Sequence, residues 1–461
     1  MRLPHIHWFL PACIAAYAVS VMAGGCAQIG MPMGGPRDTI PPVLLQSSPP
    51  DSTLHFSGSR IVFTFDEYVQ LVNVQQSLLV NPTPRIPPNV DYKLKTVTVR
   101  IRDTLQPNTT YRLDFGNSIA DNNEGNPYRN FSYVFSTGSY LDSLQLRGRV
   151  TLAETGRVDS TLLVFLYRNL SDSAVYKEKP RYVTRLDTAG RFVFHNLPPG
   201  VYNVFALKDE SGQRVYSRDD ETFAFLDSSV TLPDTGRAVH LFAYNQEKPA
   251  QKGVVTRNIP EKKLKYATSL TGDLQDVLTP LTITFNNKLM QFDSGKIRLT
   301  DTLGHPLAAA VTLDSTRKVI TLAARWVPAT DYRLEISSEV GKDTLGNSLL
   351  KSDTLKFKTK KESDYGSVKL NFRNLDKYQH PVLQVVSNNV VEKSYPLTGR
   401  TLSIPLLDPG TYDLRILEDS NQNGVWDPGN YHDRKQPEKV IYLPLKFNVR
   451  ANWDNEKDID L

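Results

Sequence analysis

The segment IVFTFD at residues 61–66 is the clearest indication of how this chain folds, and a similar segment, LTITFN, recurs at residues 281–286. In both stretches apolar side chains alternate with polar ones, which is the period of a β-strand with one buried face. The two stretches lie 220 residues apart. Self-similarity at a long, fixed distance indicates that a β unit has been duplicated within the chain.

Two further pairs of motifs support the duplication and interleave with each other. PNTTYRLD at residues 107–114 matches PATDYRLE at residues 328–335, with an offset of 221 residues. LPPGVY at residues 197–202 matches LDPGTY at residues 407–412, with an offset of 210 residues. The order along the chain is therefore A-B-A′-B′, and each unit has about the length of a seven-strand sandwich.

The resulting prediction is an all-β fold made of tandem β-sandwiches. Short alternating runs bounded by Gly, Pro, Asn and Asp are typical of such sandwiches. The expected sandwiches cover residues 38–140, 144–245, 262–361 and 365–461.

Composition excludes several classes of protein. Apolar residues make up 40% of the 461 residues, which is enough for folded cores. Cys13 and Cys26 are the only cysteines, so a disulfide framework in the sandwiches is excluded. The net charge of +5 arises from 54 basic and 49 acidic residues that are well mixed along the chain. Without a dense basic tract we expect no nucleic-acid partner.

The N-terminus predicts export and lipidation. Residues 1–25 have a basic start and an apolar stretch, as in a signal peptide, and residues 26–37 then form a tether. The ending AGGC at residues 23–26 resembles a bacterial lipobox, which implies diacylation of Cys26 and an acyl anchor in the outer membrane. The alternative is an ordinary signal peptide followed by an incidental cysteine. The tether lacks an acidic run, which favours the periplasmic face over the cell surface.

Modules A and A′ resemble the bacterial Ig-like domain named after the S-layer protein SbsA. The resemblance rests on four motifs of the first copy: PPV at 41–43, SPPD at 48–51, FTFD at 63–66 and LQPNTTY at 105–111. The second copy keeps the strand and the tyrosine but lacks the opening motif.

Modules B and B′ resemble the transthyretin-like or carboxypeptidase-regulatory-like sandwich. The motifs that carry this resemblance are GRV at 148–150, DTAGRFVF at 187–194 and LPPGVY at 197–202. In the carboxypeptidases that sandwich is a noncatalytic appendage, so the resemblance implies no catalytic domain. Together with the lipobox, the combination resembles envelope lipoproteins of the Bacteroidota.

One loop of module B′ has the spacing of a calcium site. Oxygen-bearing groups occupy alternate positions, as in the first part of an EF-hand loop: Asp419, Asn421, Asn423, the carbonyl of Val425, and Asp427. Gly424 permits the sharp turn, but no acid occupies the twelfth position. The alternative is a set of Asx-turns in which these side chains bond their own backbone. The corresponding loop of module B favours that alternative, because Arg214 stands in place of the glycine.

A second recurring pattern is Asp-Ser/Thr followed by an apolar residue or threonine, which occurs eleven times. It resembles the O-glycosylation acceptor of exported Bacteroidota proteins. The residues that this resemblance marks for modification include Thr39, Ser52, Thr104 and Ser143. The alternative is a structural role, because Asp-Ser/Thr also closes a turn and the next apolar residue then begins a strand.

These observations predict a lipid-anchored, noncatalytic envelope protein whose sandwiches present binding or scaffold surfaces to an envelope protein or a glycan. Nucleophile elbows, P-loops and dinucleotide-binding fingerprints are absent from the sequence. One alternative is a lipoprotein that binds or processes glycans, with Trp326, Trp426 and Trp453 as candidate stacking residues. Another is an accessory subunit of an outer-membrane assembly or secretion complex.

Overall fold

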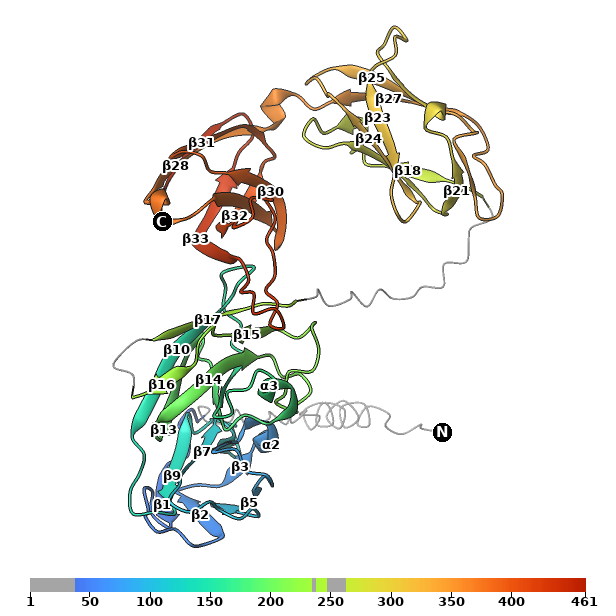
Figure 1. Ribbon diagram of the computed structural model, residues 1–461. Coiled ribbons are helices and arrows are strands. Elements are labelled where there is room, and N and C mark those ends of the chain that lie inside the picture. Colours follow the sequence, from blue (N-terminus) through green and yellow to red (C-terminus); the bar gives the residue numbers. More distant parts are fainter. Residues whose placement is uncertain (1–37, 234–237, 247–262) are drawn as a thin grey trace, which may run out of the picture.

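A computed structural model describes residues 38–233, 238–246 and 263–461 (Figure 1). The predicted leader and the predicted tether, which includes Cys26, lie outside the described residues. The prediction of an all-β chain of sandwiches is confirmed, because the regular structure of the described residues is strands arranged in sheets, with only a few one-turn helices. Among the described residues, no helix is long and apolar enough to cross a bilayer.

Module A contains the strand that the first motif predicts. One sheet has the order β1-β2-β6-β5 and the facing sheet has the order β4-β7-β9, with β3 and β8 pairing beside them. The bounds are β1 Leu44–Ser48, β2 Arg60–Phe65, β3 Val69–Leu71, α2 Val74–Ser77, β4 Leu79–Asn81, β5 Asn89–Lys93, β6 Thr96–Arg100, β7 Thr110–Gly116, β8 Ile119–Asp121 and β9 Phe131–Ser136.

Module A′ repeats this plan. Its sheets have the orders β18-β20-β24-β23 and β19-β27-β25-β22, with β21 and β26 as the lateral pair. The bounds are β18 Tyr266–Thr268, β19 Leu274–Gln275, β20 Leu281–Phe285, β21 Leu289–Phe292, η1 Ser294–Lys296, β22 Ile297–Thr300, β23 Ala309–Leu313, β24 Val319–Ala324, β25 Asp331–Ile336, β26 Gly341–Asp343 and β27 Asp353–Thr359.

Module B packs a three-stranded sheet, β13-β10-β17, on a second sheet of order β12-β11-β14-β15, and β16 also pairs with β14. Strand β17 runs parallel to β10. The bounds are β10 Leu144–Leu152, β11 Leu163–Tyr167, α3 Ala174–Lys177, β12 Tyr182–Arg185, β13 Arg191–Leu197, β14 Gly200–Leu207, β15 Phe223–Phe225, β16 Val230–Leu232 and β17 Val239–Ala243.

Module B′ has the same two sheets, with orders β31-β28-β34 and β30-β29-β32-β33. Strand β34 runs parallel to β28, as β17 does to β10. The bounds are η2 Glu362–Asp364 in the segment that leads into the module, β28 Gly366–Arg373, η3 Leu375–Lys377, β29 Pro381–Ser387, β30 Val390–Pro396, β31 Thr401–Leu407, β32 Gly410–Glu418, β33 Lys439–Val449 and β34 Asp454–Asp460.

The repeated tyrosines make the same contacts in each pair of modules. The hydroxyl of Tyr111 accepts the Gln106 N–H at 2.8 Å, and that of Tyr332 accepts the Val327 N–H at 3.1 Å. In modules B and B′, Tyr202 and Tyr412 each donate to a carbonyl four residues upstream, at 2.8 Å and 2.9 Å. The motif spacing therefore encodes a local hydrogen bond that closes the turn before each strand.

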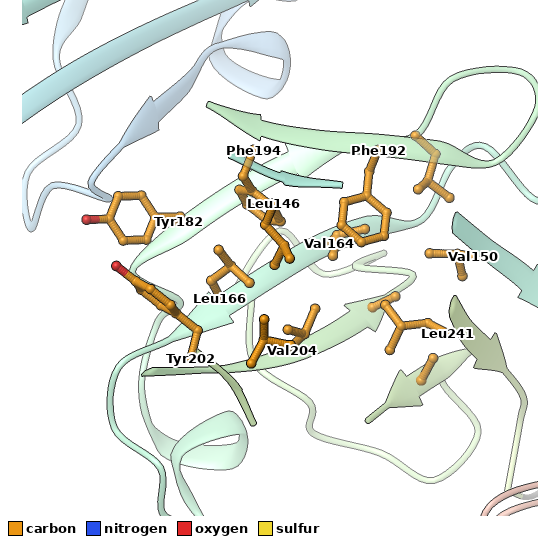
Figure 2. Close-up of a cluster of buried hydrophobic side chains, with 14 of the residues drawn as sticks. Leu146, Val150, Val164, Leu166, Tyr182, Phe192, Phe194, Tyr202, Val204 and Leu241 are labelled. Atoms are coloured by element: carbon orange, nitrogen blue, oxygen red, sulfur yellow. The ribbon is translucent and has the colours of Figure 1, made fainter. Parts of the chain in front are cut away.

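The core of module B lies between its two sheets (Figure 2). Leu146 and Val150 point inward from β10 against Phe192 and Phe194 of β13 and residues of the facing sheet. Gly148 lies between them, where a Cβ atom would come within 2.4 Å of the Phe192 ring and 2.5 Å of the Val239 carbonyl. The glycine of the GRV motif is therefore required by the close approach of β13 and β17.

Candidate functional site

The predicted modification sites within the described residues are accessible. The side chains of Thr39, Ser52, Thr104 and Ser143 belong to exposed residues. Exposure is a condition for glycosylation, and the modification itself stays a prediction. The predicted lipidation site, Cys26, lies outside the described residues.

The loop that the sequence marks for calcium brings its predicted residues together. The carboxylate of Asp419 is buried and accepts the N–H groups of Asn423 at 3.2 Å and Gly424 at 2.7 Å. The amides of Asn421 and Asn423 both donate to Asp427, at 2.5 Å and 3.0 Å. The predicted residues thus lie close together, but their contacts are those of Asx-turns: the amide nitrogens of Asn421 and Asn423, not their oxygens, are directed at Asp427. Calcium binding stays a prediction.

The three candidate tryptophans do not form a common platform. Trp326 is 8% exposed and packs in the core of module A′ against Tyr332 and Phe357. Trp426 is half-buried, and its indole N–H donates to the Glu438 carbonyl at 2.7 Å. Trp453 is 60% exposed, beside Arg450. The arrangement gives no support to a glycan site built on clustered tryptophans.

The segment that follows the calcium-like loop docks module B′ onto module B. Tyr431 is 2% exposed and inserts into a group of aromatic side chains of module B. The rings within 5.8 Å of its own, measured between centroids, are Tyr176, Phe205, Phe223 and Phe225. We call this cluster, with Tyr431 at its centre, the aromatic socket. The red module rests on the green one through this segment (Figure 1).

Alternation along the strands explains why the aromatic socket exists. In β11 and β14 of module B, Val164, Val204 and Ala206 face the inner core, whereas Phe165 and Phe205 face the other way. Both faces of this sheet are therefore apolar and buried. A strand that is apolar on both faces needs a second covering layer. Helix α3 of module B and Tyr431 of module B′ both contribute to that layer.

Polar contacts between modules B and B′ fix their relative position. Arg157 of module B lies 2.9 Å from Asp413 of module B′, and its guanidinium stacks over the Tyr442 ring. The Val440 N–H donates to the Ala153 carbonyl at 3.0 Å, so the turn after β10 touches β33. Arg434 pairs with Asp172 across the same junction. Module B′ is therefore held both by apolar burial and by directed hydrogen bonds.

Modules A and B are joined by the side chain of Asn81, which pairs with the backbone of β12 as an adjacent strand would. The Asn81 amide donates to the Val183 carbonyl and accepts the Val183 N–H, each at 2.8 Å. The Thr83 N–H donates to the Arg181 carbonyl at 2.8 Å. These contacts connect the end of β4 to β12 and align the two modules.

A polar groove of about 1310 Å³ lies where modules A and B meet. Module A contributes Asp114 and the turns around it, and module B contributes the outer face of the sheet β13-β10-β17. Among the described residues, the charged side chains that line the groove are Arg147, Arg149, Arg185, Arg191, Asp114 and Asp187. Four arginines against two aspartates give the groove an excess of positive charge. Within the part of the chain that the structure describes, no cluster of three or more His, Cys, Asp or Glu residues could hold a metal.

Sequence reasoning did not find the aromatic socket or the groove. The signal for the socket was present, because the run LVFLY at β11 is apolar without alternation and therefore indicates a strand buried on both faces. The signal for the groove was the pair Arg147 and Arg149 on a strand in which exposed polar residues alternate with buried ones. Neither signal predicts which segment of the chain packs against the outer face of β11 or beside the exposed face of β10.

Comparison with known proteins agrees with the module A prediction. Residues 38–137 match the sequence family described as bacterial Ig-like domain. No curated protein sequence matches this chain.

Solved structures share only local resemblance with the chain. The major pilin subunit BcpA of Bacillus cereus is 11% identical with a TM-score of 0.18, covering 68% of this chain and 98% of the pilin. A fragment of Escherichia coli alpha-2-macroglobulin is 13% identical with a TM-score of 0.20, covering 41% and 73%. The N-terminal part of the bacterial S-layer protein SbsC is 16% identical with a TM-score of 0.16, covering 51% and 47%. Similarities of this size carry no argument about function, and what identifies part of the chain is the match of residues 38–137 to the bacterial Ig-like domain.

Proposed function

We propose that this chain is a lipid-anchored, noncatalytic protein of the cell envelope, in which coupled β-sandwiches form a scaffold that presents binding surfaces. The observation that carries the proposal is the docking of module B′ on module B through the aromatic socket. Tyr431 is buried there among residues more than 200 positions earlier in the chain. Such a junction holds modules B and B′ in a fixed relative position, although module A′ lies between them along the chain.

Rigid coupling suits a scaffold for a physical reason. Domains joined only by a flexible linker move relative to each other, whereas a large apolar interface suppresses that motion. The Asn81–Val183 contacts join module A to the same body. Surfaces on A, B and B′ would then be presented to a partner at constant spacing, which lowers the entropy lost on binding.

The acyl anchor is the second part of the proposal. Acylation of Cys26 would place modules A and B near the membrane, with residues 27–37 as the tether. Two or more acyl chains make a stable anchor, because each buried methylene contributes about 0.8 kcal/mol. We expect the outer membrane, on its periplasmic face, as the location.

A substitution at Cys26 tests the anchor. We expect Cys26→Ser to abolish metabolic labelling with an alkyne-bearing fatty acid and to move the protein from the membrane fraction to the soluble fraction. Cys13→Ser is the matched control, because this cysteine lies within the leader and should not affect either readout. Equal labelling of wild type and Cys26→Ser would overturn the lipid-anchor part.

Crosslinking in cells followed by mass spectrometry tests the scaffold part. We expect reproducible crosslinks from modules A, B and B′ to the same partner, at positions that fit one rigid body. An outer-membrane barrel as the main partner would point to an accessory role in an assembly or secretion complex. The absence of any reproducible partner would count against the scaffold.

A further inference from the structure

The outer face of the sheet β13-β10-β17 carries a row of basic residues that the fold of module B does not need. Leu146 and Val150 of β10 point into the core, whereas Arg147 and Arg149 are exposed on the opposite face. Arg149 lies between Arg191 of β13 and His240 of β17 in the sheet register. Like charges directly opposite each other on neighbouring strands destabilise a sheet. The fold therefore tolerates a cost at this position.

Other residues of the protein neutralise the positive charges of this row only in part. Arg191 pairs with Asp187 at 2.8 Å, and Arg147 donates to the Gln145 side chain at 2.9 Å. Arg149 makes no side-chain hydrogen bond or ion pair with another described residue. An unpaired guanidinium in a row of bases is a binding group for an anion, because its planar fork matches a carboxylate or a phosphate.

Arg185 extends the positive charge to the wall that module B shares with module A. Its guanidinium lies 3.4 Å from the Asp114 carboxylate, but neither terminal nitrogen makes a well-formed hydrogen bond with the described residues. The guanidinium also lies against Gly116, where a Cβ atom would be 3.5 Å from it. The groove thus has arginines on its floor and at its module A side.

The duplicated module provides an internal comparison at matched positions. In module B′, the strand register places Lys369 where module B has Arg147, and Asn371 where it has Arg149. The neighbouring positions also differ: Asn371 lies between Thr401 and Asp458, not between an arginine and a histidine.

The acids of β34 neutralise the module B′ face. Lys369 pairs with Glu456 at 2.9 Å, and Arg373 lies 3.5 Å from Asp458. Strand β17 has no acidic residue at all in its sequence VHLFA. The two copies of the sheet therefore differ in charge: among the described residues, Arg147 and Arg149 of module B have no carboxylate partner, whereas Lys369 and Arg373 of module B′ each lie beside one.

We propose that the groove between modules A and B, with Arg147 and Arg149 on its floor, binds an anionic oligosaccharide through its carboxylate or phosphate groups. Beyond the arginines, the groove is lined by side chains that both donate and accept hydrogen bonds, which suits sugar hydroxyls. Those side chains are Ser77, Asn117, Asn130, Ser160, Thr184 and Thr188. An acidic peptide would use the arginines alone, whereas a glycan would also use the hydroxyl and amide side chains, so we favour the glycan.

This inference goes beyond the scaffold role and does not depend on the lipid anchor. The test is isothermal titration calorimetry of the purified full-length protein with oligogalacturonate, a glycan whose only charged groups are carboxylates. A phosphorylated oligosaccharide tests the second source of negative charge, and a neutral maltooligosaccharide of equal length is the negative control. We expect binding of at least one anionic glycan, no binding of the neutral one, and weakening with added salt because the contacts are ionic.

The variants Arg147→Gln and Arg149→Gln locate the site. We expect the double variant to weaken binding at least tenfold while the midpoint of thermal unfolding stays the same or rises, because like charges have been removed. The matched control is Lys369→Gln with Arg373→Gln on the equivalent face of module B′, which should leave the affinity unchanged. Equal losses in both double variants, no binding of either anionic glycan, or tighter binding of poly-glutamate than of the glycans would overturn the proposal.

Discussion

The ring of Tyr431 in module B′ lies 5.0 Å from the ring of Phe225 in module B, centroid to centroid, at an interplanar angle of 62°. Edge-to-face geometry of this kind is favourable between aromatic rings. Tyr431 also donates its hydroxyl hydrogen to the Asp172 carbonyl at 3.2 Å, so its polar end is satisfied at the same junction. Tyr431 thus contributes both a ring contact and a hydrogen bond to the junction between the two halves of a duplicated chain.

Tyr431→Ala should release module B′ from module B. Truncation of a buried aromatic side chain costs about 3–5 kcal/mol in a packed core, and here most of that cost falls on docking. We expect faster amide hydrogen exchange in β15, whose Phe223 and Phe225 line the aromatic socket, and a larger radius of gyration in small-angle X-ray scattering.

The matched control for this prediction is Trp453→Ala, since Trp453 is 60% exposed and outside the aromatic socket. It should leave the exchange rates in β15 and the scattering curve unchanged. An unchanged scattering curve and unchanged exchange in the Tyr431→Ala protein would show that the docked arrangement does not depend on this ring.

Arg157 and Asp413 should be energetically coupled across the same junction. Asp413 is 8% exposed and Arg157 lies 2.9 Å away. A hydrogen bond from Lys446 and the charges of Lys446 and Arg157 outweigh the effect of burial and lower the pKa of Asp413. A double-mutant cycle with Arg157→Ala and Asp413→Asn should give a coupling free energy of about 0.5–2 kcal/mol in chemical denaturation. Strictly additive effects would contradict direct pairing.

Two buried aspartates at equivalent turns should make the protein sensitive to acid. Asp121 is 1% exposed, and burial alone would raise its pKa. Hydrogen bonds from the N–H groups of residues 123–126 outweigh burial and lower the pKa below its usual 3.8. In Asp343, hydrogen bonds from Asn287 and Asn347 have the same net effect against burial.

The sign of the pH effect follows from these lowered pKa values. An aspartate whose pKa is lower in the folded state stabilises the fold above the unfolded pKa, and this contribution is lost as the pH falls through the folded pKa. We expect Asp121→Asn to lower the free energy of unfolding at neutral pH by about 1–3 kcal/mol and to flatten its decline below about pH 4. The exposed control Asp273→Asn should change neither. An Asp121→Asn protein with the wild-type pH profile would contradict this assignment.

Calcium should stabilise the loop at residues 419–427 if the predicted ligands accept the ion. We expect the midpoint of thermal unfolding to rise in calcium relative to EGTA, because an ion that binds only the folded state stabilises it. Asp427→Asn should remove the rise. Asp209→Asn, in the corresponding loop of module B, is the matched control and should keep it. The same midpoint in calcium and in EGTA would favour the alternative in which Asx-turns alone close the loop.

The strands and the repeated local contacts follow from patterns of neighbouring residues. The alternation at residues 61–66 appears as β2, with Ile61, Phe63 and Phe65 buried. The spacing of the repeated tyrosines encodes hydrogen bonds to backbone groups four or five residues upstream. Such features are predictable because strand alternation and turn closure depend on residues close together in the chain.

Which faces of the modules meet depends on the folded chain as a whole. The apolar outer face of β11 indicated a covering layer, but only the folded chain places Tyr431 there, more than 200 residues away. In the same way, Arg147 and Arg149 form part of a groove only because the Asn81–Val183 contacts set module A beside the sheet. Long-range packing depends on the shape and charge of whole surfaces, which no local pattern of residues contains.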